Sequence, residues 1–161
     1  MATKKARERL QEVWHHYDNG REHKPSSTRE ATQWAVEEGL LELPEIDPYD
    51  VLAGQMAQAL REEFDTDEKG RRYRINHAVR VTTAGVQRTF WAVMGFAPHD
   101  HMEKAFTQRR EHIIGECVQL KTDIAVYNDL TKGKQVEIQL VLDFTDDVAE
   151  REEIQRKDRA A

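Results

Sequence analysis

The chain has 161 residues, and its 24 Lys and Arg residues against 30 Asp and Glu residues give a formal charge of −6. This composition is typical of a globular, helix-rich protein and excludes a disordered one. The single cysteine, Cys117, excludes an intramolecular disulfide and a cysteine-only zinc site. No apolar run approaches the roughly 20 residues of a membrane span, and residues 1–9 lack the apolar stretch of a secretory signal. We therefore expect a cytoplasmic protein without membrane contact.

The first third of the chain has helical periodicity. Residues 3–18 repeat apolar side chains at i, i+3, i+4 and i+7, which predicts a first helix. The sequence from Ser27 to Glu30 has the spacing of a capping box, so a second helix is expected to begin there. Gly39 favours the end of this helix, because glycine readily adopts the left-handed conformation.

Asp47 and Pro48 predict the start of a third helix, which continues to about Phe64. Aspartate is a favoured N-cap residue, and proline is favoured at the first helical position. A turn is expected over 65–70. The periodicity then changes to two over 72–81, and a second β-rich run covers 86–96, so the two runs predict a β-hairpin.

The rest of the chain predicts a long helix over about 99–128 and a short strand over about 136–144. Val136, Ile138, Leu140, Leu142 and Phe144 alternate with polar residues in this last run, although a short helix is an alternative. Residues 146–161 are expected to form a charged tail or frayed helix. The predicted fold class is thus helix-rich α+β, with a single domain over 1–145.

Residue counting argues against most enzymes. The eight glycines are never closer than ten positions, so a dinucleotide fingerprint and a phosphate-cradling loop are both missing. The only serines, Ser26 and Ser27, adjoin a helix start, where capping explains them better than a nucleophile elbow does. We expect no catalytic residues and no cofactor. A metal-dependent hydrolase centred on His99, His101 and His112 is a weaker alternative, and the prediction is that no metal binds.

Basic residues are concentrated in one stretch of this acidic chain. Between Lys69 and His99 there is no Asp or Glu, so the rest of the chain carries 18 basic and 30 acidic residues. Such a local cluster can contact a phosphate backbone despite the negative net charge. An acidic protein segment, in this chain or in a partner, is an equally good occupant. The candidate nucleic-acid contacts in this stretch are Lys69, Arg71, Arg72, Arg74, Arg80 and Arg88.

The order of the predicted elements over about 1–96 resembles the winged-helix arrangement. With the long helix added, the chain looks like winged-helix transcription regulators that dimerise through a C-terminal helix. This resemblance implies that duplex DNA is the partner, that the third helix faces the bases and that the hairpin is the wing touching the backbone. The implied base-facing residues are Tyr49, Gln55, Gln58 and Arg61. The whole chain also resembles bacterial proteins of undetermined function with a terminal strand ending in Asp-Phe-Thr-Asp-Asp, a likeness that implies no function.

A narrow apolar row on the long helix predicts a homodimer. Its residues follow spacings of 7, 4, 3, 4 and 3, which is the spacing of a coiled-coil seam. The alternative is that the long helix packs on the hairpin and the last strand of its own chain. The predicted seam consists of Phe106, Ile113, Cys117, Leu120, Ile124 and Tyr127.

Two functions follow from these observations. The first is a dimeric, non-enzymatic DNA-binding protein of winged-helix type, a regulator of transcription. The second is a protein–protein interaction module in which the basic hairpin docks an acidic partner. The acidic residues at the ends of the third helix, Asp47, Asp50, Glu62 and Glu63, would repel phosphates and keep the second function open.

Overall fold

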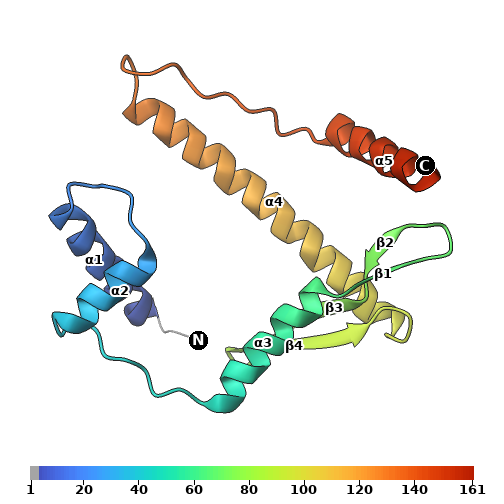
Figure 1. Cartoon of the computed structure of the whole chain (residues 1–161), viewed down its shortest axis with the longest axis horizontal. Coiled ribbons are helices and arrows are strands. Elements are labelled where there is room, and N and C mark those ends of the chain that lie inside the picture. The colour runs from blue at the N-terminus through green and yellow to red at the C-terminus, as the bar shows by residue number, and fades with distance from the viewer. Residues whose placement is uncertain (1–3) are drawn as a thin grey trace. The chain divides into compact units, whose positions relative to one another are not determined.

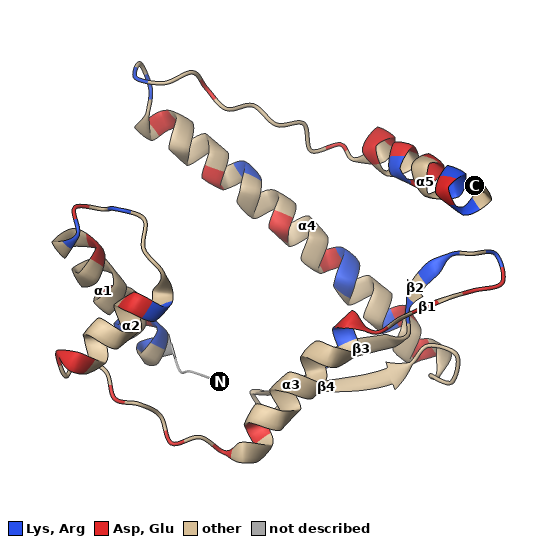
Figure 2. Cartoon of the chain, in the orientation of Figure 1, with Lys and Arg blue, Asp and Glu red and all other residues tan. Residues whose placement is uncertain are grey.

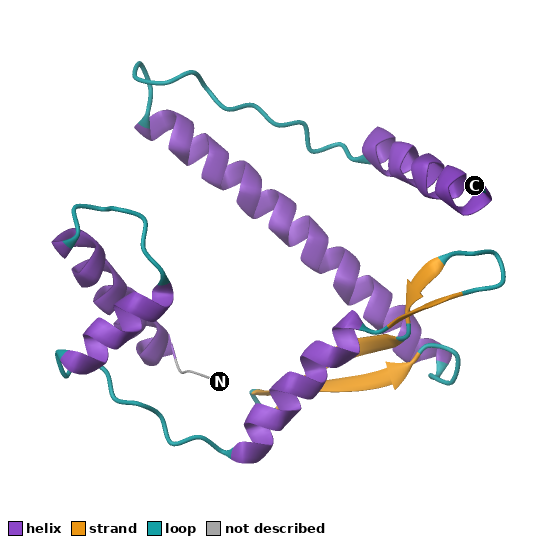
Figure 3. Ribbon diagram, in the orientation of Figure 1, coloured by secondary structure: helices purple, strands orange, loops and turns teal. Residues whose placement is uncertain are grey.

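The computed structural model describes residues 4–161 and has a helix-rich α+β architecture (Figures 1 and 3). The helices are α1 (Lys4–Gly20), α2 (Thr28–Glu37), α3 (Pro48–Glu62), α4 (His99–Leu130) and α5 (Thr145–Ala160). The strands are β1 (Phe64–Thr66), β2 (Arg72–Arg74), β3 (Asn76–Thr83) and β4 (Val86–Val93). The chain divides into two compact units, the first ending at Leu52 and the second covering Ala53–Ala161.

The first unit is a pair of helices packed through aromatic rings. The ring centroids of Tyr17 in α1 and Trp34 in α2 lie 5.4 Å apart, and Ala35 in α2 is fully buried. The predicted capping box is present, because the Ser27 hydroxyl accepts a hydrogen bond from the Glu30 backbone while the Glu30 carboxylate accepts one from the Ser27 backbone. These hydrogen bonds lower the pKa of Glu30.

The predicted end of α2 is also confirmed. Gly39 has a φ of +69°, and its N–H donates to the carbonyl of Val36. The next N–H, that of Leu40, donates to the carbonyl of Ala35 at 2.8 Å. These two bonds form a Schellman motif, which satisfies carbonyl groups that the helix end would otherwise leave free.

The second unit is built around the predicted hairpin. β3 and β4 pair antiparallel from Asn76↔Val93 to Thr83↔Val86, so only Ala84 and Gly85 form the turn. Both turn residues have positive φ, 49° and 76°, which is the geometry of a type I′ turn. Helix α4 packs against β3, and its first turns meet the hairpin there (Figure 1).

The predicted single strand over 72–81 is wrong, because the chain forms two strands separated at Ile75. β2 pairs with β1, with Arg74 opposite Phe64. Ile75 bonds to neither partner strand: its N–H donates to Glu63, and its carbonyl accepts from Met94. The predicted turn over 65–70 therefore begins inside β1. Alternation alone could not show that residues 64–66 would pair with the start of this run.

The predicted strand over 136–144 is also wrong, and the residues after it are helical. Within residues 4–161 both sheets are two-stranded, and the chain from Gln135 to Asp143 forms no strand. Two hydrogen bonds, 2.8 and 2.9 Å long, join the Asn128 side chain in α4 to the backbone of Ile138. A strand needs a neighbouring strand to satisfy its backbone, and this segment has none. The charged tail expected from residue 146 is helix α5.

The type I′ turn gives a first testable prediction. Ala84 carries a Cβ in the left-handed region, which costs an L-residue roughly 1–2 kcal/mol. Ala84→Gly should therefore raise the free energy of unfolding by about 1 kcal/mol, measured by urea denaturation. Ala92→Gly, within β4, is the control and should lower it by roughly 0.5–1 kcal/mol. Equal destabilisation by both variants would contradict the turn geometry.

Candidate anion-binding site

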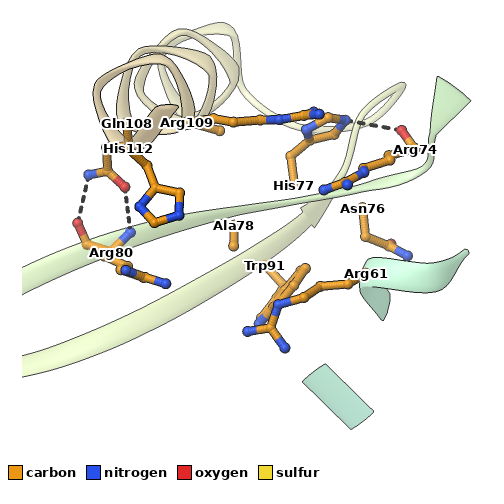
Figure 4. A pocket seen from close by; sticks show the side chains of 11 residues that line it. Arg61, Arg74, Asn76, His77, Ala78, Arg80, Trp91, Gln108, Arg109 and His112 are labelled. Carbon is orange, nitrogen blue, oxygen red and sulfur yellow. Dashed lines mark hydrogen bonds between the residues drawn. The ribbon is translucent and has the colours of Figure 1, made fainter. Parts of the chain in front are cut away.

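A pair of hydrogen bonds from one glutamine fixes α4 on the edge of the hairpin. The Gln108 Oε1 accepts from the backbone N–H of Arg80 at 2.9 Å, and its Nε2 donates to the Arg80 carbonyl at 2.8 Å (Figure 4). The amide side chain thus imitates a neighbouring strand at this position. The outer edge of β3 is therefore occupied by α4.

A cavity of about 200 Å³ lies beside these hydrogen bonds (Figure 4). We call it the arginine cavity because four arginines line it, one each from α3, β2, β3 and α4. Neither Asp nor Glu is among its lining residues. The lining consists of Arg61, Arg74, Asn76, His77, Ala78, Arg80, Trp91, Ala105, Gln108, Arg109 and His112.

The tryptophan side chain forms one wall of the arginine cavity. Trp91 in β4 pairs with Ala78 in β3, whose small side chain leaves the space open. The guanidinium of Arg61, in the last turn of α3, lies 5.4 Å from the centroid of the Trp91 ring. This is a cation–π distance, so the indole helps to hold the end of α3 beside the hairpin.

Two buried polar residues at the start of β3 tie the cavity together. Asn76 donates from Nδ2 to the Leu60 carbonyl and, at 2.6 Å, to the Glu63 carboxylate, which anchors β3 to the end of α3. His77 is 8% exposed, and its Nε2 donates to the Arg74 carbonyl at 3.0 Å. The His77 ring also meets the edge of the Phe106 ring, with centroids 5.1 Å apart.

The cavity carries more positive charge than its own residues neutralise. Burial lowers the pKa of His77, and the nearby charges of Arg109, Arg74 and His101 lower it further, against the hydrogen bond to Arg74. Burial and the charge of Arg74 likewise lower the pKa of Arg109. A bound anion would relieve the repulsion among these groups, because an opposite charge nearby favours their charged forms.

The predicted basic residues divide into two groups. Arg61, Arg74 and Arg80 line the cavity. The others lie outside it, and β3 and β4 carry no acidic residue (Figure 2). In the segment joining β1 and β2, the guanidinium of Arg71 pairs with Asp67 at 2.6 Å, and Lys69 donates its backbone N–H to the same carboxylate.

Arg72 and Arg88 differ from the cavity arginines in their surroundings. The Arg72 guanidinium stacks 3.9 Å from the centroid of the Phe64 ring. Arg88 is opposite Val81, whereas Arg80 is opposite Thr89, so the strand alternation puts Arg80 and Arg88 on opposite faces of the hairpin. The six basic residues predicted from the sequence therefore lie in different surroundings: two line the cavity and four lie outside it.

The residues predicted to face bases are all on α3. Tyr49 is 82% exposed, and Gln55 and Gln58 are also exposed. The Gln58 side chain donates to the carboxylate of Glu62, one turn further along the helix. Arg61 differs from these three because it lies at the arginine cavity.

Sequence reasoning missed the cavity residues contributed by α4. Ala105, Gln108, Arg109 and His112 follow the spacing i, i+3, i+4 and i+7, so they share one helix face. That shared face is the signal that could have identified these residues in the sequence. The apolar row predicted as a dimer seam runs along the same helix and is the more evident pattern. The alternation over 72–81 and the β-rich run over 86–96 give no signal that His77 and Trp91 line a cavity.

The apolar row on α4 is covered in part by its own chain. Phe106 contacts His77, while Leu120 and Ile124 line grooves against Leu140 and Leu142. Ile113 and Tyr127 are exposed, and Cys117 is half-buried. Whether this row joins two copies stays a prediction.

The histidines proposed as an alternative metal site have other surroundings. His101 donates from Nε2 to the His77 carbonyl at 3.0 Å, and His112 lies at the arginine cavity. Among residues 4–161, no three His, Cys, Asp or Glu side chains come together as metal ligands. In the same part of the chain, no helix combines the length and the apolar character needed to cross a membrane.

Comparisons with protein-family models, with curated proteins and with solved structures found no match to this chain. The proposals that follow therefore depend on its own residues and geometry.

The burial of His77 gives a second testable prediction. Its pKa in the folded protein lies below the ordinary value of 6.5, so the unfolded chain binds a proton that the folded protein does not. The free energy of unfolding should therefore fall as the pH drops below about 6.5 and continue to fall until the lowered pKa is passed. Urea denaturation at several values between about pH 7.5 and pH 5 measures this slope.

The matched variants are His77→Gln and His15→Gln. His77→Gln should flatten the slope in this pH range, whereas substitution of the exposed His15 should leave it in place. If both variants keep the wild-type slope, His77 is not its source.

Proposed function

We propose that this chain is a non-enzymatic nucleic-acid-binding protein and that the arginine cavity holds a phosphate of the backbone. The observation that carries the proposal is the convergence of four guanidinium groups on one cavity without a carboxylate. Guanidinium groups bind phosphate oxygens in a bidentate fork, and this contact is favoured where the local charge is not already neutralised.

The size of the cavity supports a phosphate group rather than a whole small molecule. Pockets for drug-sized ligands usually measure about 300–1,000 Å³. The arginine cavity, at about 200 Å³, is smaller. Further basic residues lie outside it, including Arg72 and Lys69 on the adjoining β1–β2 hairpin. A polymer with repeated phosphates would use both regions, which a free phosphate would not.

The order of elements supports duplex DNA as the nucleic acid. Helices α1, α2 and α3 are followed by the short β1–β2 pair and then by the β3–β4 hairpin, an order that resembles that of winged-helix regulators of transcription. In that arrangement Tyr49, Gln55 and Gln58 would face bases, while the hairpin would contact the backbone. We assign Arg61 to the phosphate contacts because it already lies at the cavity. A dimer through the α4 row would present two such surfaces.

An acidic protein partner is the second candidate function. Carboxylates and phosphates are both oxyanions that the same arginines can bind. The observation that favours a protein is the exposure of Val86, Phe90 and Val93 on β4, because a protein surface can cover apolar side chains whereas a charged phosphate backbone does not. Competition with polyglutamate against a labelled DNA duplex separates the two functions.

The third testable prediction compares neighbouring arginines of α4. Arg109 lines the cavity, whereas Arg110 pairs with Glu111 at 2.9 Å. Arg109→Gln should weaken the binding of a fluorescent random-sequence duplex roughly tenfold, and it should reduce the slope of log K against log salt by about one. Arg110→Gln removes the same charge from the same helix and should change neither quantity by as much.

Fluorescence anisotropy over a salt series measures both values. Thermal unfolding of the two variants checks that each keeps the wild-type fold. Equal effects of the two substitutions, or no duplex binding at low salt, would overturn the proposed phosphate contact.

A further inference from the structure

We propose that residues 136–144 of one copy add as a third strand to the outer edge of β4 in a second copy of this chain. The arginine cavity has no part in this pairing, so the proposal is independent of nucleic-acid binding. It begins from a segment that has the pattern of a strand and lacks a partner.

The segment is apolar on alternate residues and is poorly covered in a single chain. Val136, Ile138, Leu140 and Phe144 are between 42% and 90% exposed. Its backbone joins no sheet within residues 4–161. Exposed apolar side chains on a backbone that lacks strand partners are a template for pairing with another chain.

The β3–β4 hairpin offers only one edge for such a strand. The edge of β3 is occupied at Arg80 by the side chain of Gln108. The opposite edge, on β4, pairs with no other strand among the described residues. β4 has eight residues, which the nine residues 136–144 can match over its whole length. Val86, Phe90 and Val93 on β4 are more than 40% exposed, so apolar surface beside this edge can be buried by an added strand.

The position of Ile138 excludes the β4 edge of the same chain. Asn128 holds Ile138 through two hydrogen bonds. Asn128 lies twenty residues beyond Gln108 on α4, so the two residues are about 30 Å apart at 1.5 Å per residue. The six residues from Ile138 to Phe144 span at most about 20 Å when extended. While Asn128 holds Ile138, the segment cannot lie along the whole of its own β4, so the proposed pairing uses the edge of a second copy.

Charge complementarity supports the same partner. The segment contains Glu137 and Asp143 and is followed by Asp146 and Asp147. β4, the strand that would receive the segment, contains Arg88 and no acidic residue. Opposite charges on neighbouring strands stabilise a sheet, whereas like charges destabilise it. Pairing two segments with each other would instead bring acidic residues together.

The exchange also closes symmetrically. Each copy offers one segment and one β4 edge, so a reciprocal exchange between two copies occupies both β4 edges. The sheet grows from two strands to three, and a two-stranded sheet by itself is marginally stable in water. The expected assembly is therefore a homodimer.

The experiment measures the mass of the full chain by light scattering over a range of micromolar concentrations. Wild type should be a dimer. Gln139→Pro removes a backbone N–H from the new strand and should raise the dimer dissociation constant at least about tenfold. Gln139→Ala, the matched control, keeps that N–H and should stay near wild type. Leu140→Glu introduces a charge into the segment without changing the backbone as proline does, and it should also weaken the dimer. Circular dichroism and thermal unfolding check the fold of each variant.

Mixing experiments identify the pairing as intermolecular. In a Cys117→Ser background, one preparation carries Thr89→Cys and a second, differently tagged preparation carries Gln139→Cys. Oxidation should form a disulfide between the two differently tagged chains. A preparation with Thr82→Cys on β3 in place of Thr89→Cys should form no such disulfide. A monomeric mass at every concentration would overturn the proposal. So would a dimer that Gln139→Pro and Leu140→Glu both leave intact, because another surface would then hold it.

Discussion

The two hydrogen bonds between the Gln108 side chain and the backbone of Arg80 determine where α4 lies on the hairpin of the second unit. They hold α4 against the edge of β3, and this contact brings Arg109 and His112 to the same cavity as Arg74 and Arg80. Arginines gathered in this way repel one another, so the surrounding structure must keep them together. The anchoring of Asn76 to α3 and the contact between His77 and Phe106 supply that support.

The features that sequence reasoning predicted correctly are those encoded by adjacent residues. Ser27 and Glu30 form a capping box because they are three residues apart on one chain. The β3–β4 hairpin depends on two runs separated by a two-residue turn. The strand prediction over 136–144 failed because the alternation of apolar residues describes only that segment. It does not show whether a partner strand exists to pair with it. The division at Ile75 likewise depended on β1, a strand too short to have a pattern.

The candidate site was found only in part. The stretch without acidic residues led to Arg74 and Arg80, and the winged-helix resemblance led to Arg61. Arg109 lies on α4, which carries more acidic than basic residues, so the overall charge of this helix does not mark it (Figure 2). Its contribution follows from the face that α4 turns toward β3, and that face is chosen by tertiary contacts. A charge pattern can thus locate a basic surface, but it cannot show which cations share a cavity.

The short turn between β3 and β4 has a consequence for the order of folding. Strands joined by two residues form local contacts, and α4 begins six residues after β4 ends, so the chain can build this part without closing long loops. The proposed contacts with a second copy would form only after an encounter between molecules, which is a slower and concentration-dependent step. A newly made chain would therefore complete its arginine cavity first and assemble afterwards.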